Sequence, residues 1–138
     1  MKKNKLSYYP FHVPMSTRWI DLDAFGHVNN AIFASYIENA RSTLFTKWNL
    51  PYLGKGKSLI LASLCIDYLK QLKHPNEIIV GQKISRIGNT SFDIEASIYL
   101  SSDTNSPICN SNVVIVCFDF KTQKPIPVFK EVLEEFNS

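Results

Sequence analysis

A ten-residue stretch at positions 21–30, DLDAFGHVNN, gathers side chains that could do acid–base or nucleophilic chemistry. Either aspartate could attack an electrophile or take a proton from water, and a histidine lies four residues after the second one. The glycine between them allows a tight turn and a close approach of a ligand to the backbone. Because the same residue types are common in helix-capping loops, the stretch predicts either a capping loop or a reaction centre.

A long amphipathic helix is predicted directly after this stretch. Asn29 or Asn30 can supply its N-cap, and Pro51, Gly54 and Gly56 can end it. Apolar residues recur there at three- and four-residue steps over about five turns: Ile32, Tyr36, Ile37, Ala40, Leu44, Phe45 and Trp48. The first amides of a helix are unpaired and its dipole is positive at that end, so this helix start could hold negative charge.

The rest of the chain has the pattern of an antiparallel sheet. Strands are predicted at Val13–Ile20, Ser58–Tyr68, Ile78–Ile87, Ser91–Leu100 and Val113–Phe120. The second strand is almost continuously apolar, which is typical of a strand covered on both faces, and the fourth alternates clearly. Short turns join the last four strands, and a short helix is predicted at Lys130–Phe136. The pattern predicts an α+β domain in which a five-stranded antiparallel sheet packs on one helix.

Length and composition fit one soluble domain spanning residues 1–138, with 45% apolar and 20% charged residues. No apolar run is long enough to cross a bilayer, and Pro10 and Pro14 interrupt the region where a signal peptide would need its apolar core. Cys65, Cys109 and Cys117 lie in apolar stretches without CxxC spacing, so we expect buried thiols and no metal site. A cytoplasmic location is therefore expected.

The basic residues are scattered, and the net charge of +3 is mild, which argues against nucleic acid as the principal partner. One local group could attract a small anionic ligand: Lys55, Lys57, Lys70, Lys73 and Arg86. The alternative is that these side chains only keep the surface solvated.

The motif D-x-D-x-x-G-H-V-N-N, followed by E-x-x-R at Glu38 to Arg41, resembles the acyl-CoA thioesterases of the hotdog fold. This group includes 4-hydroxybenzoyl-CoA thioesterase and the YbgC and FadM proteins. The likeness covers roughly residues 12 to 129, because three later stretches continue it: IDYLKQLKHPNEIIV, SRIGNTSFDIEASIYL and VVIVCFDFKTQKPIPV. The resemblance implies a sheet wrapped around the helix, and two protomers whose joined sheets place the active site at their interface.

The resemblance also implies roles for three positions of the motif. Asp23 matches the family's catalytic carboxylate, which acts as nucleophile or as general base. Asn30 matches the position at the helix start whose backbone N–H polarises the thioester carbonyl. For Asp21, at the end of the preceding strand, we expect a structural role.

Further residues are candidates for handling the substrate. We expect Gly26 to let the substrate approach the loop closely, and His27 to orient water, carry a proton or cap the loop. Coenzyme A carries phosphates, so Arg86 and Lys57 are candidates for binding it. No cofactor is expected. Because one helix covers only one face of the sheet, we expect a homodimer or a homotetramer made of two dimers.

Alternative functions differ in the residues they would need. Acyl-carrier-protein thioesterases share much of the motif but carry an asparagine where this chain has Phe25, which favours a coenzyme A substrate. YbgC-type members have a tyrosine–histidine pair in place of Asn29 and Asn30, so the acyl group stays open. A hotdog hydratase would need its own aspartate–histidine arrangement after the helix, which the spacing of Asp67 and His74 does not resemble. A hotdog that binds acyl-CoA without cleaving it would not need the D-x-D-x-x-G-H motif.

Overall fold

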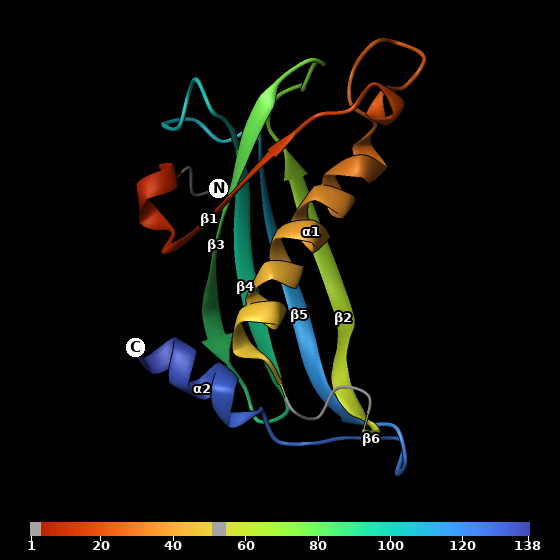
Figure 1. Cartoon of the computed structure of the whole chain (residues 1–138), viewed down its shortest axis with the longest axis vertical. Helices are drawn as coiled ribbons and strands as arrows, with labels where there is room; N and C mark the ends of the chain where they lie inside the picture. Colours follow the sequence, from red (N-terminus) through yellow and green to blue (C-terminus); the bar gives the residue numbers. More distant parts are fainter. Residues whose placement is uncertain (1–3, 51–54) are drawn as a thin grey trace.

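One long helix, α1 (Asn30–Trp48), lies against a curled antiparallel sheet in the computed structural model, which describes residues 4–50 and 55–138 (Figure 1). The main strands follow the order β1-β3-β4-β5-β2, and the short β6 pairs with β5. Their bounds are β1 Phe11–Ser16, β2 Lys57–Tyr68, β3 Glu77–Ile87, β4 Ser91–Leu100, β5 Cys109–Asp119 and β6 Lys124–Pro125. The predicted α+β architecture, with one helix wrapped by the sheet, is confirmed.

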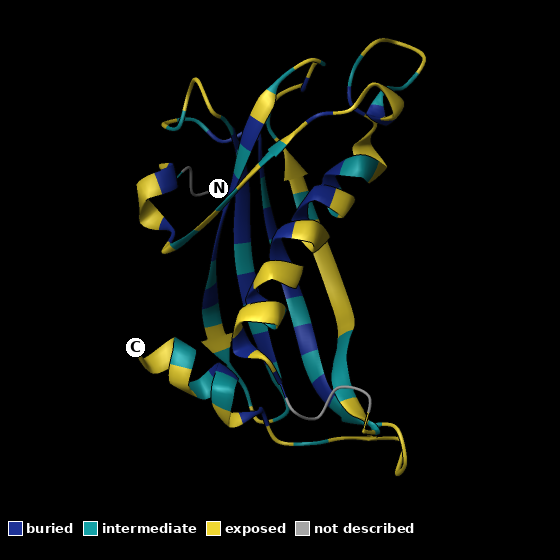
Figure 2. Cartoon of the chain, in the orientation of Figure 1, coloured by how far each residue is buried: buried dark blue, intermediate teal, exposed yellow. Residues whose placement is uncertain are grey.

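The core lies between α1 and the central strands, where Figure 2 shows the buried residues facing one another. Every second residue of β4 points to the helix, including Phe92, Ile94 and Ile98, and each of these is almost fully buried. Helical and strand periodicities therefore place one apolar stripe against one apolar sheet face. Burying each such side chain contributes about 1.5–3 kcal/mol of transfer free energy.

The first strand is shorter than predicted: it ends at Ser16, and the prediction that it reaches Ile20 was wrong. Trp19–Asp21 instead forms a 3-10 turn, η2, because the Asp21 carboxylate accepts hydrogen bonds from the backbone N–H and the guanidinium of Arg18. This local polar contact overrides the strand propensity of the apolar side chains. Trp19 and Ile20 are left 79% and 75% exposed.

The ends of α1 show which residues cap it. Asn29 is the N-cap, and its side-chain oxygen accepts the amide two residues further on at 2.9 Å. The helix ends where Asn49 adopts a left-handed conformation with φ 47°. Of the predicted terminators, Pro51 and Gly54 lie outside the described residues, and Gly56 has φ 87° in the turn before β2.

The prediction that β2 is covered on both faces was wrong, because within the described residues β2 is an edge strand that pairs only with β5, and most of its residues are exposed. Leu61 and Leu64 lie opposite Ile115 and Val113, which are buried in the core, so they share the helix-facing side of the sheet. They are nevertheless 48% and 41% exposed. An edge with free backbone groups and exposed apolar side chains is a surface that another chain can cover.

The outer face of β4 is more covered than its alternation predicts. Leu6 and Tyr9 of the N-terminal segment pack on Tyr99, and the Tyr9 hydroxyl is 2.7 Å from Ser97 Oγ. Both Ser97 and Tyr99 are therefore buried, although they lie on the face opposite the helix.

Two of the three cysteines are buried as predicted, Cys109 and Cys117. The prediction was wrong for Cys65, which is exposed because it lies on the edge strand β2. The predicted C-terminal helix is present as α2 (Lys130–Asn137). Glu135 joins it to the end of α1, accepting a hydrogen bond from Lys47 Nζ at 2.7 Å. Within the described residues, no helix is long and apolar enough to span a bilayer.

Candidate active site

The loop between η2 and α1 is anchored by Asp21, whose side chain is completely buried. Its carboxylate accepts hydrogen bonds from Arg18 and, at 2.5 Å, from the Tyr36 hydroxyl on α1. Burial acts to raise the pKa of Asp21, but the hydrogen bonds from Arg18 and Tyr36 outweigh it and lower that pKa. The Asp21 carbonyl also accepts the amide of Asn29. Asp21 thus fixes the loop to the helix, which is the expected structural role.

Asp23 closes the loop with one carboxylate oxygen and leaves the other free. Its Oδ1 accepts the amides of Phe25 at 2.8 Å and His27 at 3.2 Å. The Asp23 amide in turn donates to the His27 carbonyl. Gly26 has φ 83°, a left-handed conformation that favours glycine. Within residues 4–50 and 55–138, no hydrogen-bond partner reaches Asp23 Oδ2, so this oxygen is available to a ligand or to water.

The start of α1 offers an unpaired donor. The side-chain oxygen of Asn29 accepts a hydrogen bond from the amide of Ala31, and the backbone carbonyl of Asn29 accepts one from the amide of Ile32. The amide of Asn30 has no acceptor in the described part of the chain. Such a first-turn N–H carries the positive end of the helix dipole and can hold a developing negative charge.

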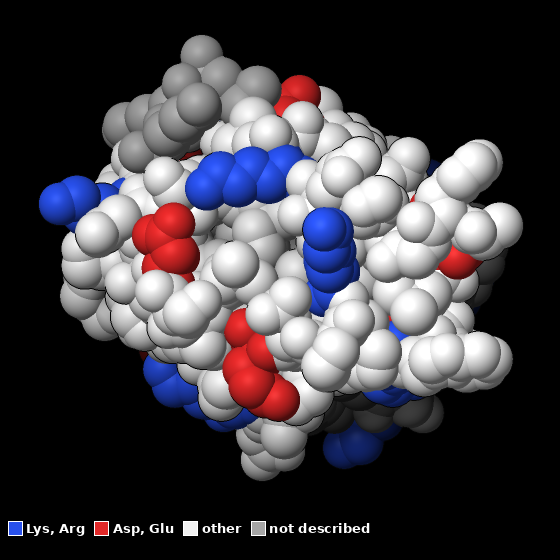
Figure 3. Space-filling model, turned by 90° about the horizontal axis from the view of Figure 1, so that it is seen from above, with Lys and Arg blue, Asp and Glu red and all other residues white. Residues whose placement is uncertain are grey.

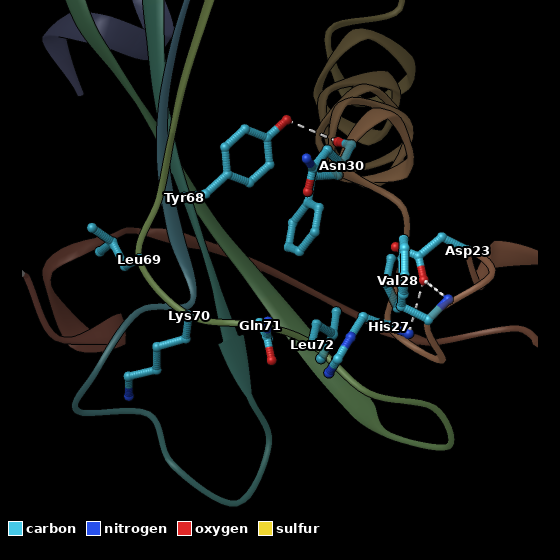
Figure 4. Close-up of a pocket in the computed structure, with 11 residues that line it drawn as sticks. Asp23, His27, Val28, Asn30, Tyr68, Leu69, Lys70, Gln71 and Leu72 are labelled. Atoms are coloured by element: carbon cyan, nitrogen blue, oxygen red, sulfur yellow. Dashed lines mark hydrogen bonds between the residues drawn. The ribbon is translucent and has the colours of Figure 1, made fainter.

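These groups line one cavity of about 550 Å³, shown in Figure 4, between the loop and the end of β2. Three predicted catalytic residues, Asp23, His27 and Asn30, all contribute to its wall. The other lining residues are Phe25, Val28, Phe33, Tyr68, Leu69, Lys70, Gln71 and Leu72. The structure therefore brings together residues from the motif and from a segment about forty positions later.

The three predicted substrate-binding residues lie elsewhere in the single chain. Gly26 borders a neighbouring hollow of about 500 Å³, which also touches Asp23. Arg86 is near the far end of β3, where its guanidinium binds the Asp93 carboxylate at 2.8 Å. Lys57 begins β2 and lines a separate hollow. Since β2 ends at the cavity, Lys57 stands roughly 35 Å from it along the strand.

Sequence reasoning did not single out Tyr68, and it named Lys70 only within a group of five basic residues that could attract a small anionic ligand. The Tyr68 hydroxyl donates to the Asn30 carbonyl at 2.8 Å, as Figure 4 shows. Lys70 is half exposed, with its Nζ 3.9 Å from the Asp103 carboxylate. Their sequence signal is a polar segment, DYLKQLK, directly after an apolar strand. Figure 3, which views this end of the molecule, shows basic and acidic side chains interspersed rather than massed.

The arrangement suits attack on a carbonyl group. Such a reaction places negative charge on the carbonyl oxygen, and it needs a fixed donor for that charge and a group that attacks or activates water. The Asn30 amide and the free oxygen of Asp23 are a donor and a base on one cavity. No group of three or more His, Cys, Asp or Glu side chains that could hold a metal occurs in the described residues.

Comparison with known proteins places this chain in a thioesterase-like family. The model of the Thioesterase-like superfamily matches residues 17–136. The chain is 29% identical over 108 residues to the uncharacterized protein YsmA of Bacillus subtilis (strain 168), covering 78% of this chain and 71% of YsmA. It is 24% identical over 130 residues to the chloroplastic acyl-acyl carrier protein thioesterase ATL3 of Arabidopsis thaliana, covering 91% of this chain and 67% of ATL3. A solved thioesterase of Thermus thermophilus, complexed with coenzyme A and Zn, is 28% identical with a TM-score of 0.79. The match covers 94% of this chain and 99% of the Thermus chain.

Proposed function

Because this chain belongs to the thioesterase-like superfamily and has its hotdog fold, we propose that it hydrolyses acyl-CoA thioesters to a free acid and coenzyme A. The observation that carries this proposal is that Asp23, with one unbonded carboxylate oxygen, and Asn30, with an unpaired amide, line the same cavity in the described part of the chain. A thioester carbonyl bound there would have a base or nucleophile at its carbon and a donor at its oxygen.

Asp23 acts in one of two ways. As general base it takes a proton from water, whose oxygen attacks the thioester carbon and displaces the coenzyme A thiolate. As nucleophile it attacks that carbon itself, forms a mixed anhydride as the thiolate leaves, and is regenerated when water hydrolyses the anhydride. In both routes the Asn30 N–H holds the oxyanion. His27 lines the same cavity, and its proposed role there is to orient the water or carry a proton.

Coenzyme A is the proposed carrier because the 28% identical thioesterase of Thermus thermophilus is solved with coenzyme A. Lys70, on the cavity wall, is a cation that can meet its phosphates. Arg86 and Lys57 keep their proposed role only if a second chain brings them to the site, since neither lines this cavity within one chain.

A homodimer built on β2 would supply such a second chain. The free edge and the exposed Leu61 and Leu64 favour pairing of β2 with its own copy. Two copies of one strand related by a twofold axis perpendicular to the strand run antiparallel. The start of one β2 then lies near the end of the other, so Lys57 of the partner subunit would approach Tyr68 and the cavity. A tetramer would add a second such dimer.

A panel of acyl-CoA esters, assayed for release of free thiol, tests the proposed function. Saturable hydrolysis of at least one aromatic or aliphatic acyl-CoA is expected, with the preferred acyl group read from the ratio of kcat to KM. If coenzyme A esters bind but none is cleaved, the protein is a binding module and the catalytic assignment is wrong.

A second candidate, an acyl-carrier-protein thioesterase, is favoured by the 24% identity to ATL3. Phe25 argues against it, because it stands where the corresponding motif has an asparagine. Offering the same acyl group on coenzyme A and on acyl carrier protein separates the two. A clearly higher kcat/KM with acyl carrier protein would replace the coenzyme A proposal.

A further inference from the structure

We propose that Tyr68 is a positioning residue of this site: its hydroxyl holds the first turn of α1 in the orientation that aims the Asn30 amide into the cavity. The inference rests on the proposed thioesterase function and adds a residue from β2 to it. Tyr68 is the last residue of this edge strand, and its ring forms part of the cavity wall (Figure 4).

Two contacts join Tyr68 to the helix start. Its hydroxyl donates to the Asn30 carbonyl at 2.8 Å, and its ring meets the edge of the Phe33 ring with centroids 5.3 Å apart. Asn30 and Phe33 are one turn apart on α1, so a single side chain restrains both ends of that turn. A carbonyl oxygen has two lone pairs, so Asn30 can accept this hydroxyl as well as a helix amide.

No other hydrogen bond in the described part of the chain joins α1 to β2. The remaining anchors of the helix start, Asp21 and the Asn29 cap, belong to the preceding loop. That loop is also tied to the segment after β2, because the Val28 amide donates to the Leu72 carbonyl at 2.8 Å, but none of these contacts reaches the Asn30 carbonyl. Tyr68 fixes it from the opposite wall of the cavity. We expect that loss of this contact would let the first turn fray more readily.

The hydroxyl is suited to this role at neutral pH. Burial, with a smaller contribution from Cys109, raises the pKa of Tyr68, so the group stays protonated and remains a donor. The side chain is nevertheless 47% exposed, and water could satisfy its hydroxyl in other rotamers. The bond to Asn30 therefore matters for the orientation of the turn more than for burial of a polar group.

The test is Tyr68→Phe, which keeps the ring and its contact with Phe33 and removes only the donor. Losing an oxyanion donor outright lowers kcat by about 10²–10³-fold, so a misaimed donor should lower it by roughly tenfold or more. KM should stay within about twofold, because ground-state binding is unchanged. Tyr8→Phe, at a hydroxyl on the opposite side of the sheet, is the control and should match the parent.

A second readout does not depend on catalysis. Hydrogen exchange at the amide of Ala34, one turn after Asn30, should be faster in Tyr68→Phe than in the parent, while the unfolding midpoint stays the same. An active parent whose Tyr68→Phe variant has the same kcat would overturn the positioning role and leave the proposed function standing. If the parent cleaves no thioester, the proposed function fails, and equal Ala34 exchange in the two proteins would then overturn the restraint as well.

Discussion

Asp21 and Asp23 are two positions apart, yet their carboxylates have opposite surroundings. The Asp21 side chain is fully buried, and both of its oxygens accept hydrogen bonds, from Arg18 and from Tyr36. Asp23 uses one oxygen to close its own loop and presents the other at a cavity. The first carboxylate is therefore committed to structure, whereas the second has capacity left for chemistry, and the two can be separated by mutation.

Removing the partner of Asp21 should destabilise the protein without involving the cavity. Tyr36→Phe deletes the hydroxyl that donates to the buried carboxylate, and a hydrogen bond to a charged group is worth about 1.5–3 kcal/mol. We expect the free energy of unfolding, measured with urea, to fall by roughly that amount. Tyr68→Phe, at a half-exposed ring, is the matched control and should change the free energy of unfolding by less than about 0.5 kcal/mol. Equal losses in both variants would contradict the anchoring role of Asp21.

Stability should also fall in acid for a defined reason. The pKa values of Asp21 and Glu135 are lowered in the folded state, because hydrogen bonds outweigh the effect of burial. Their stabilisation is fully present above the unfolded pKa values of about 3.9 and 4.3, and it is lost as pH falls through the lower folded values. Unfolding measured from pH 6 to 3 should show this loss. Asp21→Asn should be less stable at pH 6 and lose less stability on acidification, and an unchanged pH slope would contradict the assignment.

The edge strand predicts an oligomer. Sedimentation should show at least a dimer at micromolar concentration, and Leu64→Glu should weaken it, because a charge would enter the apolar surface beside the free edge of β2. Phe136→Glu, at a similarly exposed apolar residue on α2, is the control and should leave the assembly intact. A monomeric parent would remove the interface on which the proposed roles of Lys57 and Arg86 depend.

Elements with a strong hydrophobic period could be predicted from the sequence. The predicted bounds of β4 match the structure, and those of β3 match to within one residue, because their alternation reports directly which face is buried. The predicted apolar stripe of the long helix, from Ile32 to Trp48, lies within α1. Residue type and position also predicted the structural role of Asp21 and a cap at Asn29 or Asn30, of which the structure uses Asn29. Local chemistry within a few residues was sufficient for these predictions.

Features that depend on distant neighbours could not be predicted in the same way. The apolar run of β2 was interpreted as a doubly covered strand, but its burial depends on whether a neighbouring strand exists, which composition does not report. The contact of Tyr68 with Asn30 joins residues 38 positions apart and arises only when β2 is laid beside β5. The early end of β1 is an exception, because it depends on local hydrogen bonds between Arg18 and Asp21.

Coenzyme A binding can be tested with substrates that differ only in the nucleotide. Lys70→Ala and Lys57→Ala should raise KM for an acyl-CoA by roughly two- to fivefold, the size expected for an exposed ion pair. KM for the matching acyl-pantetheine thioester, which lacks the nucleotide, should not change. Arg86→Ala is included in the same series. Arg86 is already bound to Asp93, so its substitution should raise KM only if a partner chain brings Arg86 to the nucleotide. Unchanged KM in all three variants would mean that the nucleotide is bound elsewhere or mainly by backbone.

Asp23→Asn is the decisive variant for the chemistry. Asparagine keeps the shape of the side chain and an oxygen that can accept the amides of Phe25 and His27, so the loop should keep its fold and the protein its oligomeric state. The charge is lost, so kcat for thioester hydrolysis should fall by about 10²–10⁴-fold, the usual contribution of a positioned base. Asp21→Asn provides the comparison: it should be less stable but clearly more active than the Asp23 variant under conditions where both are folded. Parent-like hydrolysis by Asp23→Asn would reduce Asp23 to a loop-closing residue, since asparagine closes such a loop about as well as aspartate.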